Sequence, residues 1–115
     1  MAGQMDFSGV PRIHTFAAAE KFWAEAKPWR NELTTWRPLD GRRDRHKRIV
    51  CIDDGEGYQL VLYNTPLVTY YRTGDLALET YDTFSSRDFA DRIAPNGCRV
   101  HSVARRMYWE FPSQE

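Results

Sequence analysis

The sequence has no excess charge of either sign, few cysteines and no long apolar run. Its 115 residues include 16 basic and 16 acidic side chains, so the formal net charge is zero and no long-range attraction to nucleic acid or membrane is predicted. Cys51 and Cys98 are too few for a disulfide framework, and each falls in an expected strand as a small apolar side chain. No stretch approaches the roughly 20 apolar residues of a membrane span, and no signal-like run opens the chain. A soluble, cytoplasmic protein is expected.

Aromatic side chains are what the sequence has in quantity. Phe, Trp and Tyr make up 14% of the residues, with four tryptophans and six tyrosines. A chain of this length predicts a single domain, residues 1–115, with a modest core. Large rings fill such a core, and where they are exposed they form recognition surfaces. Both interpretations stay open from the sequence.

Residues 58–80 show the clearest alternation of apolar and polar positions. Three runs rich in β-branched and aromatic residues, 58–63, 67–71 and 76–80, have the period of two that is typical of strands. The runs are separated by Asn64-Thr65-Pro66 and by a turn containing Gly74, residue types that favour tight turns. The pattern predicts an antiparallel meander of three strands.

A helix is expected directly after this meander. Ser85 is a suitable N-cap, Asp88 falls at the third helical position, and Phe84 and Phe89 have the spacing of a hydrophobic staple. Phe89, Ala90 and Ile93 then form an apolar stripe that can pack on a sheet.

An N-terminal helix is expected from the cap Thr15 to about Lys27, with Phe16, Ala19 and Trp23 on one face. Further strands are expected over 49–52, 98–103 and 107–111, with 33–36 as a short candidate. The sequence therefore predicts an α+β fold, a mostly antiparallel sheet of five or six strands with an N-terminal helix and a short helix packed on it.

Two segments lack such patterns. Residues 1–12 are small and polar, and a loose N-terminus is expected there, with Phe7 or Val10 as the residues that could pack. Residues 37–48 form an expected basic loop, with six basic residues against Asp40 and Asp44. Such a loop can bind phosphate, because arginine forks match phosphate oxygens, or its arginines can pair with local aspartates in solvent. The neutral overall charge favours the second interpretation.

The patterns for catalysis are weak. Cys98 and His101 lie three apart in an expected strand and would point to opposite faces, so no metal site is predicted. Ser85 and Ser86 lack the glycines of a nucleophile elbow. The acidic residues 53–56 fit a hairpin turn better than a cation site or a metal-dependent nuclease. We therefore expect no catalytic residues, no cofactor and no enzymatic activity.

Between residues 58 and 87 the sequence reads YQLVLYNT, then LVTY, Gly74, LAL and TFSSR. In this pattern the stretch 58–97 resembles a loose group of small uncharacterised proteins from tailed phages and prophages. The chain departs from the group where a double glycine often follows the third strand, since residues 79–82 read ETYD. The resemblance implies a phage or prophage origin and no known chemistry. By analogy it implies an accessory binding protein in the host cytoplasm.

The favoured function is therefore binding to a host or phage protein, for example inhibition of a host defence system such as CRISPR–Cas. Trp, Tyr and Arg dominate the energetic centres of protein interfaces. On that ground the expected partner-binding residues are Trp36, Arg37, Arg42, Arg43, Arg45, Tyr71, Arg72 and Tyr81.

Nucleic-acid binding is the alternative function. In it, Tyr63, Tyr70, Tyr71 and Tyr81 would stack on bases, and Arg72 with the arginines of 37–48 would contact phosphates.

Overall fold

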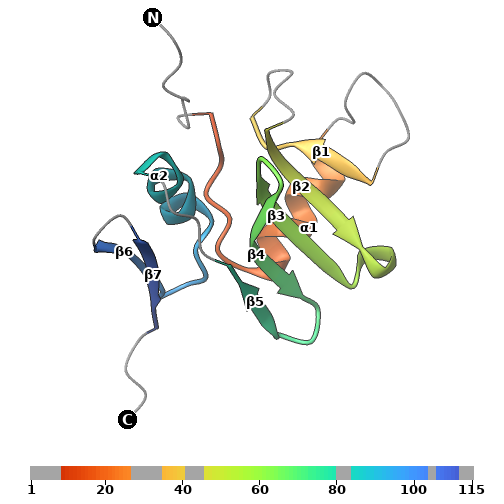
Figure 1. Ribbon diagram of the computed structural model, residues 1–115. Coiled ribbons are helices and arrows are strands. Elements are labelled where there is room, and N and C mark those ends of the chain that lie inside the picture. Colours follow the sequence, from red (N-terminus) through yellow and green to blue (C-terminus); the bar gives the residue numbers. More distant parts are fainter. Residues whose placement is uncertain (1–8, 27–34, 41–45, 80–83, 104–105, 112–115) are drawn as a thin grey trace, which may run out of the picture.

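The computed structural model describes residues 9–26, 35–40, 46–79, 84–103 and 106–111. It confirms the predicted α+β fold (Figure 1). In chain order the helices and strands are α1 (Phe16–Glu25), β1 (Trp36–Pro38), β2 (Lys47–Ile52), β3 (Gly57–Leu62), β4 (Thr65–Tyr71), β5 (Leu76–Leu78), α2 (Phe84–Ile93), β6 (Arg99–Val103) and β7 (Arg106–Glu110), with a 3₁₀ turn at Asp53–Gly55.

The first five strands form one antiparallel sheet in the order β1-β2-β3-β4-β5. Ile49 lies opposite Leu60, Leu60 opposite Val68, and Val68 opposite Leu78, so these residues share one face of the sheet. The first three are fully buried. The expected C-terminal strands β6 and β7 are present, but they pair with each other in a separate two-stranded sheet.

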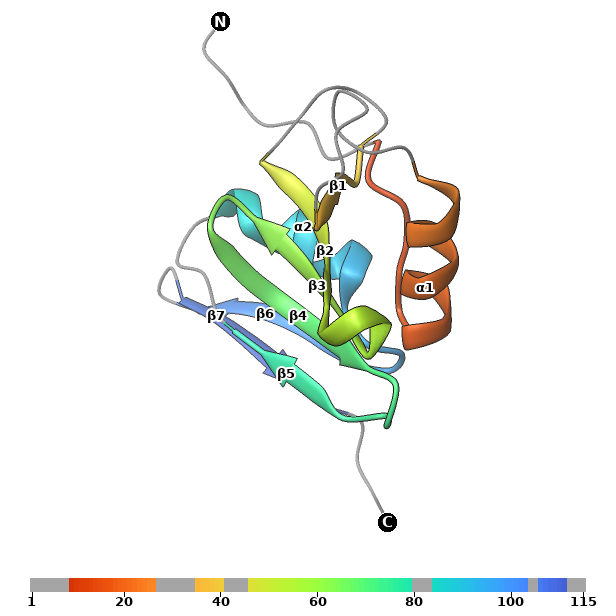
Figure 2. The same cartoon turned by 90° about the vertical axis from the view of Figure 1, so that its right-hand side faces the viewer.

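Helix α1 covers the face of the sheet that carries this row, as Figure 2 shows. The expected cap is confirmed, because the Oγ1 atom of Thr15 accepts a hydrogen bond from the backbone N–H of Ala18 at 3.0 Å. The rings of Phe16 and Trp23 lie 5.5 Å and 6.0 Å from the ring of Tyr58 between their centroids. The predicted apolar face of this helix therefore packs on β3.

Helix α2 lies between the five-stranded sheet and the β6–β7 hairpin (Figure 1). Phe89, Ala90 and Ile93 are fully buried, which confirms the predicted stripe. The helix begins at Phe84, so Ser85 belongs to its first turn and the prediction of Ser85 as the N-cap is wrong. Phe84 is already part of the helix, so the helix begins earlier than capping preference alone predicts.

Residues 9–14 run along the seam between the sheet and α2. The backbone N–H of Ile13 donates to the carbonyl of Arg92 at 2.9 Å. The hydroxyl of Tyr70 lies 2.6 Å from the carbonyl oxygen of Ile93 and 3.2 Å from that of Ile13. Val10 is buried, as the sequence suggested, but a loose N-terminus is wrong for residues 9–12, because this segment closes the core. Residues 1–8 lie outside the described ranges.

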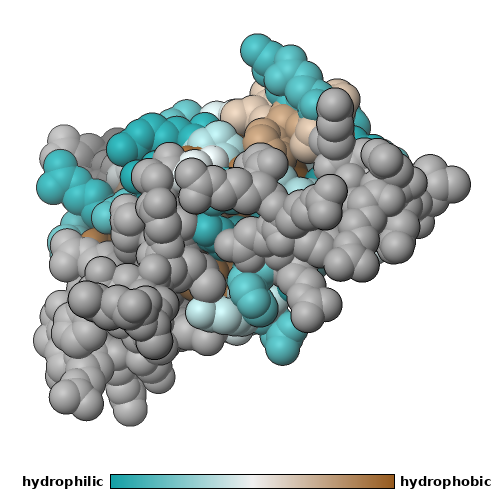
Figure 3. All heavy atoms as spheres, turned by 90° about the horizontal axis from the view of Figure 1, so that it is seen from above, coloured by the Kyte–Doolittle hydropathy of each residue, from teal (hydrophilic) through white to brown (hydrophobic). Residues whose placement is uncertain are grey.

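Most apolar side chains are hidden in this core. Seen from above, the described residues present a largely hydrophilic surface with small hydrophobic areas (Figure 3). A few large apolar residues of the described part of the chain are exposed, namely Tyr63, Leu76, Tyr108 and Phe111. Of these, Tyr63 stands beside a hollow in the surface.

Candidate functional site: the Arg48 pocket

The turn between β3 and β4 is a two-residue loop, Tyr63-Asn64, because Leu62 lies directly opposite Thr65. The predicted turn Asn64-Thr65-Pro66 is therefore wrong, since Thr65 and Pro66 belong to β4. Pro66 lies opposite Val61, next to a bulge where the register of β3 and β4 shifts. A proline is tolerated at such a position, because the ladder of hydrogen bonds is locally interrupted there.

Tyr63 has an unusual backbone conformation for its residue type. Its φ angle is +56°, in the left-handed region that two-residue hairpin loops normally give to Gly, Asn or Asp. A bulky residue there costs on the order of 1 kcal/mol. The tyrosine side chain is 36% exposed, so core packing does not account for it. An exposed ring held on a strained backbone is a reason to look for function at this turn.

Tyr63 is one wall of a hollow of about 240 Å³, whose other described walls are His46, Arg48 and Asn64. We call this hollow the Arg48 pocket. The ring of His46 lies 5.1 Å from the ring of Tyr63 between centroids, at 48°. Its four residues bring an imidazole, a guanidinium, a phenol and an amide together at one end of the meander.

The backbone of Tyr63 forms hydrogen bonds with both Arg48, on β2, and His46, which directly precedes β2. Arg48 Nη2 donates to the carbonyl oxygen of Tyr63 at 2.6 Å, and the N–H of Tyr63 donates to the carbonyl of His46 at 2.7 Å. The guanidinium of Arg48 also lies 5.8 Å from the ring centre of Trp36 on β1. Partial burial lowers the pKa of Arg48, although an arginine remains a cation at any physiological pH.

Trp36 and Arg37, which the sequence analysis grouped together, point to opposite faces of β1. Trp36 faces the Arg48 side. Arg37 faces α1, where its guanidinium lies 4.1 Å from the ring centre of Trp23 and its Nη1 donates to the Trp23 carbonyl. Arg37 therefore helps to hold α1 on the sheet, and the strand alternation separates it from the pocket.

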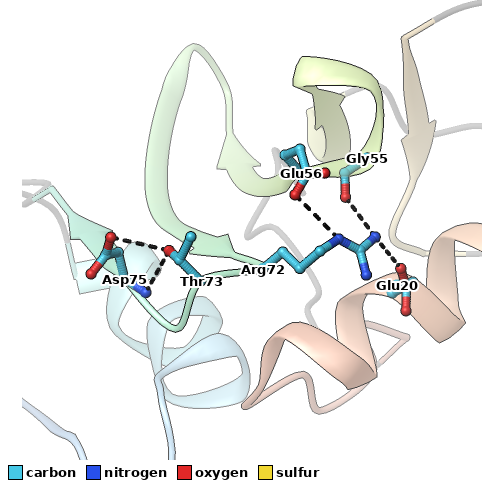
Figure 4. A network of polar contacts seen from close by, with 6 residues as sticks. All are labelled: Glu20, Gly55, Glu56, Arg72, Thr73 and Asp75. Carbon is cyan, nitrogen blue, oxygen red and sulfur yellow. Dashed lines mark hydrogen bonds and ion pairs between the residues drawn. The ribbon is translucent and has the colours of Figure 1, made fainter.

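Tyr71 and Arg72 lie at the other end of the meander. The guanidinium of Arg72 pairs with the carboxylates of Glu20 at 2.7 Å and Glu56 at 3.2 Å, and donates to the Gly55 carbonyl at 3.1 Å (Figure 4). It also lies 4.9 Å from the ring centre of Phe16. These contacts join α1 to the β2–β3 turn. The first of them, the hydrogen bond to Glu20, is the main cause that raises the pKa of Arg72.

The expected basic loop at 37–48 is shorter than predicted. Arg37 and Pro38 belong to β1, and Lys47 and Arg48 belong to β2. Strand β1 is an edge strand, which can hold Pro38 because the missing N–H can face away from the ladder. Near the strand ends, Lys47 forms a buried ion pair with Asp40 at 3.3 Å. The predicted site residues Arg42, Arg43, Arg45 and Tyr81 lie outside the described residues, and their partner-binding role stays a prediction.

The three predicted stacking tyrosines that the structure describes, Tyr63, Tyr70 and Tyr71, do not form one surface. Tyr70 is buried in the core, where burial raises the pKa of its hydroxyl well above the usual range, so its predicted role in base stacking is wrong. Tyr71 is half-buried at the end of β4, far along the strand from the turn that holds Tyr63. His46 and Asn64 were not predicted as site residues, because only the register of β2, β3 and β4 brings them together.

Within the described ranges, no group of three or more His, Cys, Asp or Glu residues is arranged to hold a metal ion. Neither of the two described helices has the length and apolar character needed to cross a membrane. Comparisons with models of protein families, with curated proteins and with solved structures found no match to this chain.

Proposed function

We propose that this chain is a non-enzymatic binding protein that recognises a protein partner through the surface around the Arg48 pocket. The observation that supports it is the strained, exposed Tyr63 beside Arg48. A hairpin selected only for stability would place Gly or Asn at this position. The strain is understandable if the ring is needed for contact with another molecule.

The residue types around the pocket are those of an interface centre. Trp, Tyr and Arg give most of the binding energy in protein interfaces, because each combines a large apolar area with directed polar groups. Trp36, Arg48 and Tyr63 bring one of each to the same end of the meander. The hollow that Arg48 and Tyr63 help to line would receive a single protruding side chain of the partner.

The biological setting of this proposal comes from the sequence resemblance to phage and prophage proteins. It suggests a host or phage protein as the partner, for example a component of a host defence system such as CRISPR–Cas, met in the host cytoplasm. The surface around Arg48 is where we expect such a partner to bind.

The test is capture of a partner from host lysate by the tagged chain, with half of each sample treated with nuclease. The pocket variants Arg48→Gln and Tyr63→Ala are compared with Arg99→Gln and Tyr108→Ala, which change exposed residues of the β6–β7 hairpin. We expect a protein that resists nuclease treatment to be retained by the wild type and both controls, and lost with both pocket variants. Equal capture by all five chains would contradict the proposed surface.

Nucleic-acid binding is the second candidate, because the exposed ring of Tyr63 stands beside a guanidinium at the pocket. If it is correct, the bound material disappears on nuclease treatment, and the affinity for single strands falls steeply as salt is raised.

A further inference from the structure

We infer that the Arg48 pocket receives the carboxylate of one aspartate or glutamate side chain of the protein partner. This inference rests on the proposed function and names the chemistry that the same surface recognises.

The groups around the hollow are suited to a planar anion. Arginine presents its N–H donors in a rigid fork that matches the two oxygens of a carboxylate. The hollow is also lined by the amide of Asn64, the imidazole of His46 and the phenol of Tyr63, all of which are polar groups of the donor type. A carboxylate that entered the hollow would therefore meet a polar lining beside the guanidinium of Arg48.

The fork of Arg48 is oriented before any partner arrives. Its Nη2 is held 2.6 Å from the carbonyl oxygen of Tyr63, and its planar group lies near the ring of Trp36. Because Arg48 is partly buried, an incoming negative charge would interact with it through a medium somewhat less polarisable than bulk water. Because this long side chain is already ordered, it loses less conformational entropy when a partner binds.

The size of the hollow favours one side chain over a small-molecule ligand. Its volume of about 240 Å³ lies below the range of about 300–1,000 Å³ that is usual for sites of small organic ligands. It is also open to solvent beside the exposed residues His46 and Asn64, so a side chain on a partner surface can reach it.

The charge of the chain favours a carboxylate over the phosphates of a nucleic acid. A polyanion is held by many basic residues that release counterions, and such proteins usually have an excess of positive charge. Here 16 basic and 16 acidic side chains balance. A single acidic residue needs only one positively charged group nearby, and Arg48 provides it at the pocket.

The experiment is a titration of the ¹⁵N-labelled chain at pH 7 and constant ionic strength, observed through backbone and side-chain N–H signals. The probe is N-acetyl-aspartate N-methylamide, and its uncharged match is N-acetyl-asparagine N-methylamide. We expect saturable shifts of the Arg48, Asn64 and Tyr63 signals with the aspartate probe. Binding of the asparagine probe should be at least about tenfold weaker, which corresponds to loss of one charge-assisted contact.

Three variants make the titration specific. Arg48→Gln should abolish the shifts, Arg48→Lys should weaken them because it retains the charge without the fork, and Arg99→Gln should leave them unchanged. Retained dispersion of the core amide signals shows that each variant is folded. The inference is overturned if both probes give equal shifts, if the shifts survive Arg48→Gln, or if they appear elsewhere in the chain.

A third probe, inorganic phosphate, separates this inference from the nucleic-acid candidate. Phosphate that binds the pocket about tenfold more tightly than the aspartate probe overturns the carboxylate assignment and supports the nucleic-acid candidate. The proposed function has its own outcome. If pocket-dependent protein capture persists while the aspartate probe fails, only the carboxylate is wrong, whereas loss of pocket dependence in the capture experiment rejects the binding surface itself.

Discussion

The β2–β3–β4 meander has an arginine at each end, and each arginine lies over an aromatic ring beside a hairpin turn. At one end Arg72 lies over Phe16, next to the turn formed by residues 53–55. At the other end Arg48 lies near Trp36, next to the turn Tyr63-Asn64. Each guanidinium donates to a backbone carbonyl of its turn, that of Gly55 or of Tyr63.

The two ends differ in which residues adopt positive φ. Arg72 is bound by two carboxylates of its own chain, and the left-handed positions of its turn are Asp53, Asp54 and Gly55, residue types that accept them easily. At the Arg48 end a tyrosine takes the left-handed position at the edge of a hollow. The Arg72 end thus follows the rules of stable folding, whereas the Arg48 end departs from them at an exposed ring.

Of the changes that test this comparison, the largest loss of stability is expected at Tyr70, which lies near the Arg72 end of β4. The change Tyr70→Phe removes the hydroxyl that bonds to the carbonyls of Ile13 and Ile93 and leaves these buried groups without that donor. We expect the free energy of unfolding at pH 8 to fall by about 1–2 kcal/mol. Chemical denaturation measures it, and partner capture should not change.

The pH dependence of the same variant provides its control. Burial raises the pKa of Tyr70 in the folded state above the usual value of about 10, so the unfolded chain loses this proton first as pH rises. The wild type therefore loses stability above about pH 10 by as much as about 1.4 kcal/mol per pH unit from this group, and the variant does not. The stability difference between the two chains should shrink toward pH 11. A constant difference would show that the hydroxyl is not held as described.

Most of the fold could be predicted from the sequence because local signals and packing agree. Three local patterns each correctly predicted the structure that forms. They are the alternation in residues 58–80, the cap Thr15, and the apolar stripe of Phe89, Ala90 and Ile93. Where the predictions failed, long-range contacts decided the outcome. Residues 9–12 have the composition of a loose terminus, yet they are fixed by the seam between the sheet and α2.

The candidate site was harder to predict, because it depends on register and on which face a strand residue occupies. The sequence marked Trp36 and Arg37 as one group, although neighbouring strand residues point to opposite faces. It also placed the turn after Tyr63 rather than on it, because Asn64 and Pro66 are the stronger turn formers in isolation. The positive φ of Tyr63 opposes local preference and therefore has no signature in the sequence.

A smaller loss of stability is expected when Arg72 is changed. The change Arg72→Gln removes the pairs with Glu20 and Glu56 that join α1 to the β2–β3 turn. Because this network is exposed, we expect a modest fall in melting temperature at low salt that diminishes as salt is raised. The matched control is Lys21→Gln, an exposed charge on α1, which should show no such salt dependence. If Arg72→Gln instead reduced partner capture, the contrast between a structural and a functional end of the meander would be lost.

The smallest change in stability, and the sharpest test of the comparison, is expected at Tyr63. Glycine adopts positive φ without strain, so Tyr63→Gly should keep the free energy of unfolding within about 0.5 kcal/mol of the wild type although it deletes a large side chain. Tyr63→Ala deletes the ring but retains the strain, and should lie about 1 kcal/mol below the glycine variant. Both should lose partner capture. A glycine variant as unstable as the alanine variant would mean that the side chain of Tyr63 stabilises the fold. The positive φ of Tyr63 would then no longer distinguish the Arg48 end as a functional surface from the Arg72 end.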